Sequence, residues 1–174
     1  MSSSPNDISK VAILGAGVMG AQIAAHFANN GYPVVLFDLP SQKGHPNANI
    51  QKSLKALTKL KPAPLATNGH TRFIEPANYE TDLGKLAQCE LVIEVIAERP
   101  DWKKDLYAKI VPHLAPNAIL ATNTSGLRIN DLATTLPDEV KNRFLGIHFF
   151  NPPRYMELVE LIPAEQTRRS RCSL

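Results

Sequence analysis

The chain has few cysteines, few aromatic residues and no long apolar run. Its 174 residues include two cysteines, Cys89 and Cys172, too few and too far apart for a disulfide framework or a cysteine metal site. Aromatic residues make up 6% and do not alternate with a basic stripe, which argues against nucleic-acid binding. Apolar stretches stay well below the roughly 18 residues of a membrane helix. We therefore expect a cytoplasmic protein with no metal, no nucleic-acid partner and no membrane partner.

Strand-like and helix-like stretches alternate along the chain, a pattern typical of an α/β fold with a mostly parallel sheet. The predicted strands are 10–14, 33–38, 91–97, 118–121, 144–150 and 155–162, and the predicted helices are 18–30, 101–114 and 129–136. Residues 41–78 are expected to form an insertion with a helix of its own over 50–61. Residues 1–9 are expected to be a flexible leader and residues 164–174 an unstructured tail, which leaves 10–163 as the folded domain.

A glycine-rich turn joins the first predicted strand to the first predicted helix. It reads GAGVMG, and its candidate cofactor contacts are Gly15, Gly17, Val18, Met19 and Gly20. In this G-x-G-x-x-G pattern the first glycine permits the tight turn, and the second lets a pyrophosphate approach the backbone. The third glycine lets the helix pack closely on the strand. The phosphates would lie at the helix N-terminus, where free N–H groups and the helix dipole favour negative charge.

The second predicted strand ends in a carboxylate, Asp38, 23 positions after Gly15. A carboxylate at this place accepts hydrogen bonds from both hydroxyls of an adenosine ribose and repels a 2′-phosphate. No arginine follows it directly, so NAD is favoured over NADP. Together these features predict a Rossmann-type doubly wound, mostly parallel sheet with a helical insertion and a final antiparallel strand. The alternative is a turn that merely connects strand and helix, with Asp38 as a helix cap.

A histidine stands near the end of a buried strand, in the segment FLGIHFFNPP. If the chain turns around residue 154 and residues 155–162 run back antiparallel, His148 lies opposite Glu160. Directly opposite side chains have Cβ atoms about 4.5–5.5 Å apart, so the carboxylate could hold the imidazole in one tautomer. Imidazole is the usual base for removing a hydroxyl proton near neutral pH. The alternative is a core histidine satisfied by backbone groups.

Further polar residues are expected at the carboxyl ends of strands, where ligands bind in this architecture. Asn123 and Ser125 follow one strand and could hydrogen-bond a nicotinamide ribose or a substrate oxygen, or simply cap the next helix. Glu94 and Glu98 close another strand, and Glu98 could equally form an ion pair with Lys103.

Three lysines share one face of the helix expected over 50–61, namely Lys52, Lys55 and Lys59. This basic face could hold the phosphates of a large anionic ligand, or it could be an ordinary solvated face.

These segments together resemble the short-chain L-3-hydroxyacyl-CoA dehydrogenase family of fatty-acid β-oxidation. The resemblance is carried by VAILGAGVMGAQIA, Asp38, LVIEVIAE, ATNTSGL and GIHFFNPPRYMELVEL, and it spans nearly the whole chain. It implies NAD as the cofactor and an acyl-CoA as the substrate, whose 3-hydroxyl is oxidised. The family continues into a helical C-terminal domain that supplies dimer contacts, acyl-chain binding and a further catalytic asparagine. The resemblance therefore implies a longer, homodimeric parent protein, and this chain alone is expected to be inactive.

The resemblance also implies roles for single residues. His148 would be the general base, Glu160 its orienting carboxylate, and Ser125 would orient the substrate oxygen. The residues implied to bind NAD are Asp38, Glu98, Lys103, Asn123 and Asn151, and those implied to contact CoA are Ser125, Lys52 and Lys59. Arg154 and Tyr155 depart from the small or apolar residues typical of the family, and the final RRSRCSL does not resemble it.

Two other functions stay open from the sequence. A 3-hydroxyisobutyrate-type dehydrogenase begins with a similar glycine turn, but it requires a catalytic lysine further on and lacks HFFNP. An NAD-binding module without turnover is the other alternative. A parent protein fused to an enoyl-CoA hydratase is also compatible with the resemblance.

Overall fold

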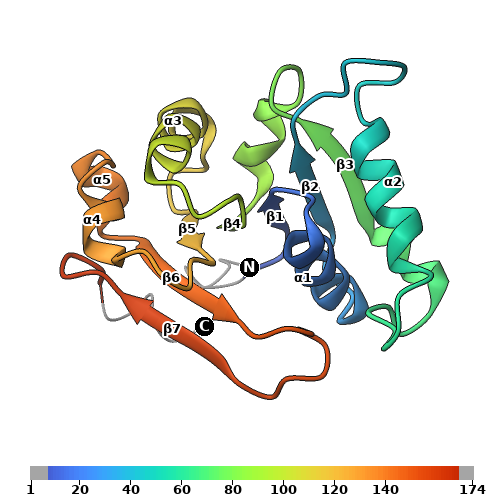
Figure 1. The fold of residues 1–174 in the computed structure, drawn as a ribbon. Coiled ribbons are helices and arrows are strands. Elements are labelled where there is room, and N and C mark those ends of the chain that lie inside the picture. Colours follow the sequence, from blue (N-terminus) through green and yellow to red (C-terminus); the bar gives the residue numbers. More distant parts are fainter. Residues whose placement is uncertain (1–7, 169–174) are drawn as a thin grey trace, which may run out of the picture.

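A computed structural model describes residues 8–168, whose strands form one seven-stranded sheet (Figure 1). The strands lie in the order β3-β2-β1-β4-β5-β6-β7. Their bounds are β1 Val11–Leu14, β2 Val34–Asp38, β3 Ile74–Asn78, β4 Leu91–Glu94, β5 Ile119–Thr122, β6 Phe144–Phe149 and β7 Val159–Pro163. Pairing is parallel from β3 to β6, and β7 runs antiparallel to β6. The predicted fold class, with its final antiparallel strand, is confirmed.

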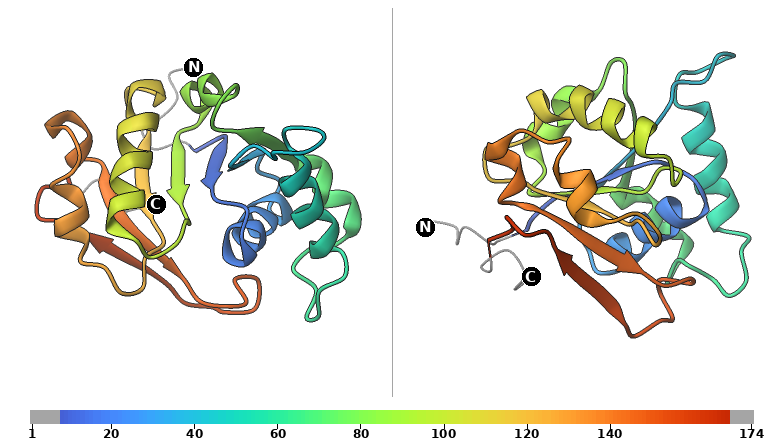
Figure 2. Two further views of the ribbon diagram at one scale, coloured as in Figure 1. Left: turned by 45° about the horizontal axis from the view of Figure 1, so that its top comes forward. Right: turned by 60° about the vertical axis from the view of Figure 1, so that its left-hand side comes forward.

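Helices cover both faces of the sheet, as the views in Figure 2 show. The α-helices are α1 Val18–Asn29, α2 Ala48–Leu57, α3 Pro100–Ile110, α4 Ile129–Ala133 and α5 Asp138–Lys141. The 3₁₀ helices are η1 Asn68–Phe73, η2 Leu83–Gln88 and η3 Val111–His113. Helices α1 and α2 share one apolar cluster with the sheet, and α3, α4 and α5 share the other. Because both faces are covered, a central strand such as β1 consists of four buried apolar residues rather than alternating ones.

Helix α1 ends where the sequence predicts. Asn30 caps it, and Gly31 follows with a φ of 83°, in the left-handed region that glycine adopts without a steric penalty. Alanine-rich turns with small side chains let α1 lie close to the strands, and Ala24, Ala25 and Ala28 are fully buried. This close packing fixes the helix N-terminus against the end of β1.

The segment predicted as an insertion contains a strand that the sequence reasoning missed. Residues 74–78, IEPAN, form β3, which pairs in parallel with β2 at the edge of the sheet. The segment lacks the continuous apolar pattern of the central strands, and Pro76 cannot donate a ladder hydrogen bond, which an edge strand tolerates. The helix expected over 50–61 is also shorter than predicted, because α2 ends at Leu57 and Lys59 lies beyond it.

A few residues of the predicted tail and leader make hydrogen bonds to the folded domain. In the tail, the Thr167 hydroxyl donates to the carbonyl of Phe144, and the Arg168 N–H donates to the carbonyl of Asn142 at 2.9 Å. In the leader, Ser9 donates from its backbone N–H to Glu90 at 3.1 Å. These contacts attach 164–168 and Ser9 to the domain. The predictions for 1–7 and 169–174, Cys172 included, lie outside the described residues.

The described residues also bear on the expectations about membrane helices and cysteines. Within 8–168, no helix is both long and apolar enough to cross a membrane. Cys89 is a buried free thiol, and burial raises its pKa to about 12. The thiol therefore stays protonated near neutral pH and behaves as a small apolar group.

Candidate cofactor site and active site

The glycine turn between β1 and α1 has the backbone geometry that its pattern predicts. Gly15 has a φ of 112°, and a Cβ there would lie 2.9 Å from the carbonyl oxygen of Val95. A Cβ on Gly20 would overlap the carbonyl oxygen of Gly15. Gly17, the N-cap of α1, would meet nothing within 4 Å, and it leaves the helix without a side-chain cap. The turn therefore has no room for side chains at Gly15 and Gly20, and it is open at Gly17, where a phosphate would approach.

Gly20→Ala is expected to abolish NADH binding or weaken it more than tenfold. The added methyl group collides with backbone rather than with a movable side chain, so α1 must shift away from the turn. Calorimetric titration with NADH measures the loss. Gly84→Ala is the matched control, since a Cβ at Gly84 meets nothing within 4 Å. Equal NADH affinity in wild type and Gly20→Ala would contradict this account of the turn.

A cavity of about 520 Å³ opens beside this turn at the carboxyl ends of β1, β2 and β4. Asp38 and Leu39 border it from the end of β2, and Tyr79 from the end of β3. On the other side lie residues 95–97 and Trp102 of α3. Asp38 is therefore placed beside the glycine turn, as predicted. Leu39, Tyr79 and Trp102 were not predicted; for Tyr79 the missing signal was β3, which brings it to this edge.

The buried Glu94 side chain, at the end of β4, anchors the loop that follows this strand. The Glu94 carboxylate is fully buried and accepts two hydrogen bonds from the Lys103 ammonium, at 2.6 and 2.8 Å. It also accepts from Thr122 Oγ1 at 2.8 Å, from Tyr107 Oη at 3.0 Å, and from the N–H of Ile96 at 2.7 Å. These bonds fix the wall of the cavity to the sheet.

The alternative for Glu98, an ion pair with Lys103, is not what the structure shows. Lys103 is 1% exposed and its ammonium is committed to Glu94, because the helical turn of α3 directs it inward under the loop. Glu98 instead accepts from Thr124 Oγ1 at 2.6 Å and from the N–H of Ser125 at 2.9 Å. Lys103 thus supports the cavity wall through Glu94, and a direct contact with a cofactor stays a prediction.

The segment after β5 makes hydrogen bonds both to the loop after β4 and to the end of β6. Asn123 Oδ1 accepts a hydrogen bond of 2.9 Å from the N–H of Phe149, next to His148. Ser125 is exposed and bonded to Glu98, and its hydroxyl lies 3.5 Å from that carboxylate. Asn123 and Ser125 therefore lie between the β4 loop and the end of β6, in the place the sequence assigns to them.

The His148–Glu160 juxtaposition predicted from the sequence is confirmed. The two residues are directly opposite in the β6–β7 ladder, and His148 Nδ1 lies 2.9 Å from Glu160 Oε2. Because a carboxylate only accepts, the bond requires the proton on Nδ1 and leaves Nε2 free as a base. The imidazole also packs edge-on against Phe150, with ring centroids 4.6 Å apart. Asn151 follows, and its Oδ1 accepts from Gln22 of α1 at 3.4 Å.

Comparison with known proteins shows which family the chain belongs to. The family model described as "3-hydroxyacyl-CoA dehydrogenase, NAD binding domain" matches residues 10–173. The chain belongs to this family. A protein of Rickettsia prowazekii described as a trifunctional enzyme of a fatty acid oxidation complex is 49% identical over 158 residues, which are 90% of this chain and 22% of that protein. A Bacillus subtilis protein described as a 3-hydroxyacyl-CoA dehydrogenase is 39% identical over 175 residues, with coverages of 92% and 22%.

Solved structures of this family show the same fold. The 3-hydroxybutyryl-CoA dehydrogenase of Escherichia coli K12 superposes with a TM-score of 0.79 at 29% identity, covering 95% of this chain and 34% of that one. The (S)-3-hydroxybutyryl-CoA dehydrogenase of Ralstonia eutropha gives a TM-score of 0.75 at 33% identity, with coverages of 95% and 57%. The chain therefore spans 22% of the length of these two curated relatives and 34% and 57% of the length of these two solved structures.

The residues of this NAD-binding domain fit the cofactor that the family name states. The exposed N-terminus of α1 can receive the pyrophosphate, and Asp38 can receive the adenosine ribose. Val18 is 70% exposed at the start of α1, whereas Met19 packs against the apolar cluster beneath the helix. The nicotinamide end would then point toward Asn123 and His148, because Asn123 follows β5 and His148 lies near the carboxyl end of β6 at the same edge.

The insertion of the NAD-binding domain lies against the glycine turn. Ser53 of α2 donates a hydrogen bond of 2.9 Å to the carbonyl of Ala16. Lys52 and Lys55 are exposed on α2, and Lys59 is exposed just beyond its end, so a role in CoA binding stays a prediction for them. Arg154 and Tyr155, which depart from the family pattern, fasten the β6–β7 hairpin to the insertion. Both donate to the carbonyl of Ala63, at 2.8 and 2.9 Å.

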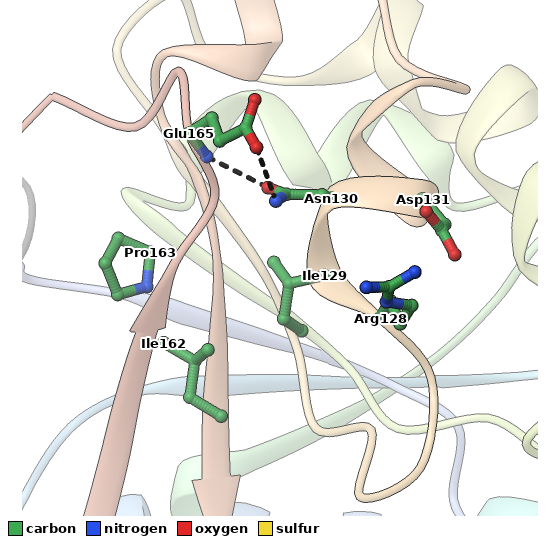
Figure 3. Close-up of a pocket in the computed structure, with 7 residues that line it drawn as sticks. All are labelled: Arg128, Ile129, Asn130, Asp131, Ile162, Pro163 and Glu165. Carbon is green, nitrogen blue, oxygen red and sulfur yellow. Dashed lines mark hydrogen bonds between the residues drawn. The ribbon is translucent and has the colours of Figure 1, made fainter.

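A second cavity of about 350 Å³ lies between α4 and the end of β7 (Figure 3). Figure 3 shows its polar side chains Asn130 and Glu165 bonded to each other, through an amide–carboxylate bond of 3.2 Å and a backbone N–H bond of 2.9 Å. The lining contains none of the residues predicted for catalysis or cofactor binding. This cavity is therefore separate from the candidate site.

Proposed function

We propose that the protein oxidises the 3-hydroxyl of (S)-3-hydroxyacyl-CoA to 3-oxoacyl-CoA in fatty-acid β-oxidation, and that this chain is its NAD-binding domain. The observation that supports this function is the His148–Glu160 pair at 2.9 Å, set at the same sheet edge as the glycine turn. A cytoplasmic, homodimeric parent protein with a helical C-terminal domain belongs to the same proposal.

The chemistry follows from the geometry of the pair. Glu160 holds the Nδ1 proton of His148, so Nε2 can remove the proton of the 3-hydroxyl. Ser125, exposed beside Glu98, would hydrogen-bond the same oxygen and hold it toward the imidazole. NAD, when bound, supplies the acceptor for the hydride that leaves C3. Asn123 and Asn151 flank His148 and would orient the nicotinamide end.

Titration of the chain with NADH and then with acetoacetyl-CoA tests the proposal. We expect NADH to bind, NADPH to bind more weakly because Asp38 repels a 2′-phosphate, and NADH absorbance to stay constant when acetoacetyl-CoA is added. Failure to bind NADH would contradict the assignment of the cofactor site. Loss of NADH absorbance would show that these 174 residues are sufficient for turnover.

An NAD-binding module without turnover is the second candidate. The observation that favours it is the cavity beside the glycine turn, which accounts for cofactor binding without any catalytic histidine. The two candidates differ in the role of His148. Only the dehydrogenase requires its imidazole, and a binding module shows no turnover in any form of the protein.

A further inference from the structure

Tyr79 has a buried hydroxyl with no hydrogen-bond partner. The residue is 4% exposed, and among residues 8–168 its Oη is the one buried side-chain oxygen or nitrogen that lacks a partner. The other deeply buried tyrosine behaves differently, because the Tyr107 hydroxyl donates to Glu94 at 3.0 Å. Burying an unsatisfied hydroxyl costs free energy, and such exceptions in a folded protein call for an explanation.

Tyr79 belongs to the lining of the 520 Å³ cavity beside the glycine turn. It directly follows β3, whose last residue Asn78 is paired with Asp38, so Tyr79 lies next to the carboxylate predicted to hold the adenosine ribose. Its ring stacks on Phe37 with centroids 5.8 Å apart and an interplanar angle of 19°. This stacking holds the ring in place, so the position of the hydroxyl is determined by the fold.

The hydroxyl remains a donor under all working conditions. Burial, together with the negative charges of Asp38 and Glu94, raises the pKa of Tyr79 well above its ordinary value. A protonated phenol both donates and accepts, and it matches the ring nitrogens of adenine as well as the ribose hydroxyls.

The rim of the cavity suits a planar base. Leu39 after β2 and Trp102 on α3 are large apolar side chains that are 68% and 51% exposed, and both line this cavity. Strand order places β2 and β4 on either side of β1, so the two side chains approach the cavity from opposite sides. The Arg99 guanidinium lies 4.6 Å from the Trp102 ring centre and braces the indole.

We propose that the Tyr79 hydroxyl hydrogen-bonds the adenosine half of NAD. The inference rests on the assignment of this domain as NAD-binding and adds a residue that the glycine pattern does not contain. Because the hydroxyl is closed off from solvent, the nucleoside must displace part of the cavity wall to reach it. The resulting bond forms away from water, where a hydrogen bond is strengthened.

The test compares three tyrosine-to-phenylalanine variants, each of which removes one oxygen and keeps the ring. Tyr79→Phe probes the unpartnered hydroxyl, Tyr107→Phe a partnered buried one, and Tyr32→Phe a half-exposed one away from the cavity. Each variant is titrated calorimetrically with NADH, ADP-ribose and nicotinamide mononucleotide. Urea unfolding measures the stability of each ligand-free chain. The single tryptophan of the chain, Trp102, gives a second readout, because its emission is quenched by NADH bound nearby.

Tyr79→Phe is expected to weaken NADH and ADP-ribose about three- to tenfold, the range for one hydrogen bond. Nicotinamide mononucleotide should be unaffected, and the urea midpoint of the ligand-free chain should not fall. Tyr107→Phe should lower that midpoint, because Glu94 loses a donor. Tyr32→Phe should match wild type in every measurement.

Two results would overturn the inference, and they are distinguishable from failure of the NAD assignment. If Tyr79→Phe binds ADP-ribose as wild type does, the hydroxyl does not contact the adenosine half. If Tyr79→Phe lowers the urea midpoint while affinity is unchanged, the hydroxyl has a structural partner instead. A wild-type chain that binds neither NADH nor ADP-ribose overturns both the NAD assignment and this inference.

Discussion

Replacing His148 by glutamine is expected to lower oxidation of 3-hydroxyacyl-CoA about 10²- to 10⁴-fold, the usual contribution of a positioned general base. Glutamine approximates the size of imidazole and can still hydrogen-bond Glu160, but it cannot take up the hydroxyl proton. NADH affinity should be nearly unchanged, because the predicted pyrophosphate and adenosine contacts lie at the ends of β1 and β2. The measurement is the steady-state rate of a form of the protein that turns over this substrate, together with an NADH titration.

The matched controls for this prediction lie on the same hairpin. Glu160→Gln should lower the rate by a smaller factor than His148→Gln, since the imidazole keeps a partner but loses the carboxylate that fixes its tautomer. Glu157→Gln should have no effect, because Glu157 is exposed and outside the β6–β7 ladder. Unchanged turnover in His148→Gln would contradict the general-base assignment, whereas the absence of turnover in every wild-type form of the protein would favour a binding module.

The second large effect is expected from the buried Glu94–Lys103 pair. Glu94→Leu should destabilise the domain by about 3–5 kcal/mol, because it leaves an ammonium buried without a counter-charge. The Lys103 side chain is 1% exposed and cannot reach water without unpacking α3 from the sheet. Urea unfolding of the ligand-free chain measures the loss.

A variant in which neither Glu94 nor Lys103 keeps its charge is the decisive control. Glu94→Leu with Lys103→Met removes both charges at similar volume, and it should be clearly more stable than Glu94→Leu alone. The double variant should still bind NADH more weakly than the wild type does. The reason is that Ile96, Tyr107 and Thr122 lose the hydrogen-bond acceptor that fixes the cavity wall. Removing the Asp138–Lys141 pair should leave stability nearly unchanged, because Asp138 is 91% exposed and water screens its charge. A double variant no more stable than Glu94→Leu would contradict the buried-charge explanation.

The features predicted correctly are those encoded within one element or one turn. The glycine turn, the capping of α1 at Asn30 and Gly31, and the apolar central strands follow from local backbone and burial preferences. The His148–Glu160 contact was also predictable, although it joins two strands. Its register depends only on where a single antiparallel turn is centred, and side chains alternate with a period of two.

The features missed depend on contacts between distant segments. Strand β3 has an irregular pattern because Pro76 and the exposed Glu75 interrupt it, so nothing local marked it as part of the sheet. Without β3 the position of Tyr79 at the cavity could not be deduced. Lys103 lies five residues from Glu98 and nine from Glu94, and only the way α3 packs on the sheet decides which carboxylate it meets.

The sequence by itself determined the fold class, the location of the glycine turn and the pairing of His148 with Glu160, because these depend on short-range patterns of residue type. Only the tertiary structure decided which groups are buried together. It assigned Lys103 to Glu94, fastened Arg154 to the insertion, and left the Tyr79 hydroxyl unpartnered beside the nucleotide cavity. The physical reason is that burial and hydrogen-bond satisfaction are properties of the packed chain, because they depend on how separate helices, strands and loops lie against one another.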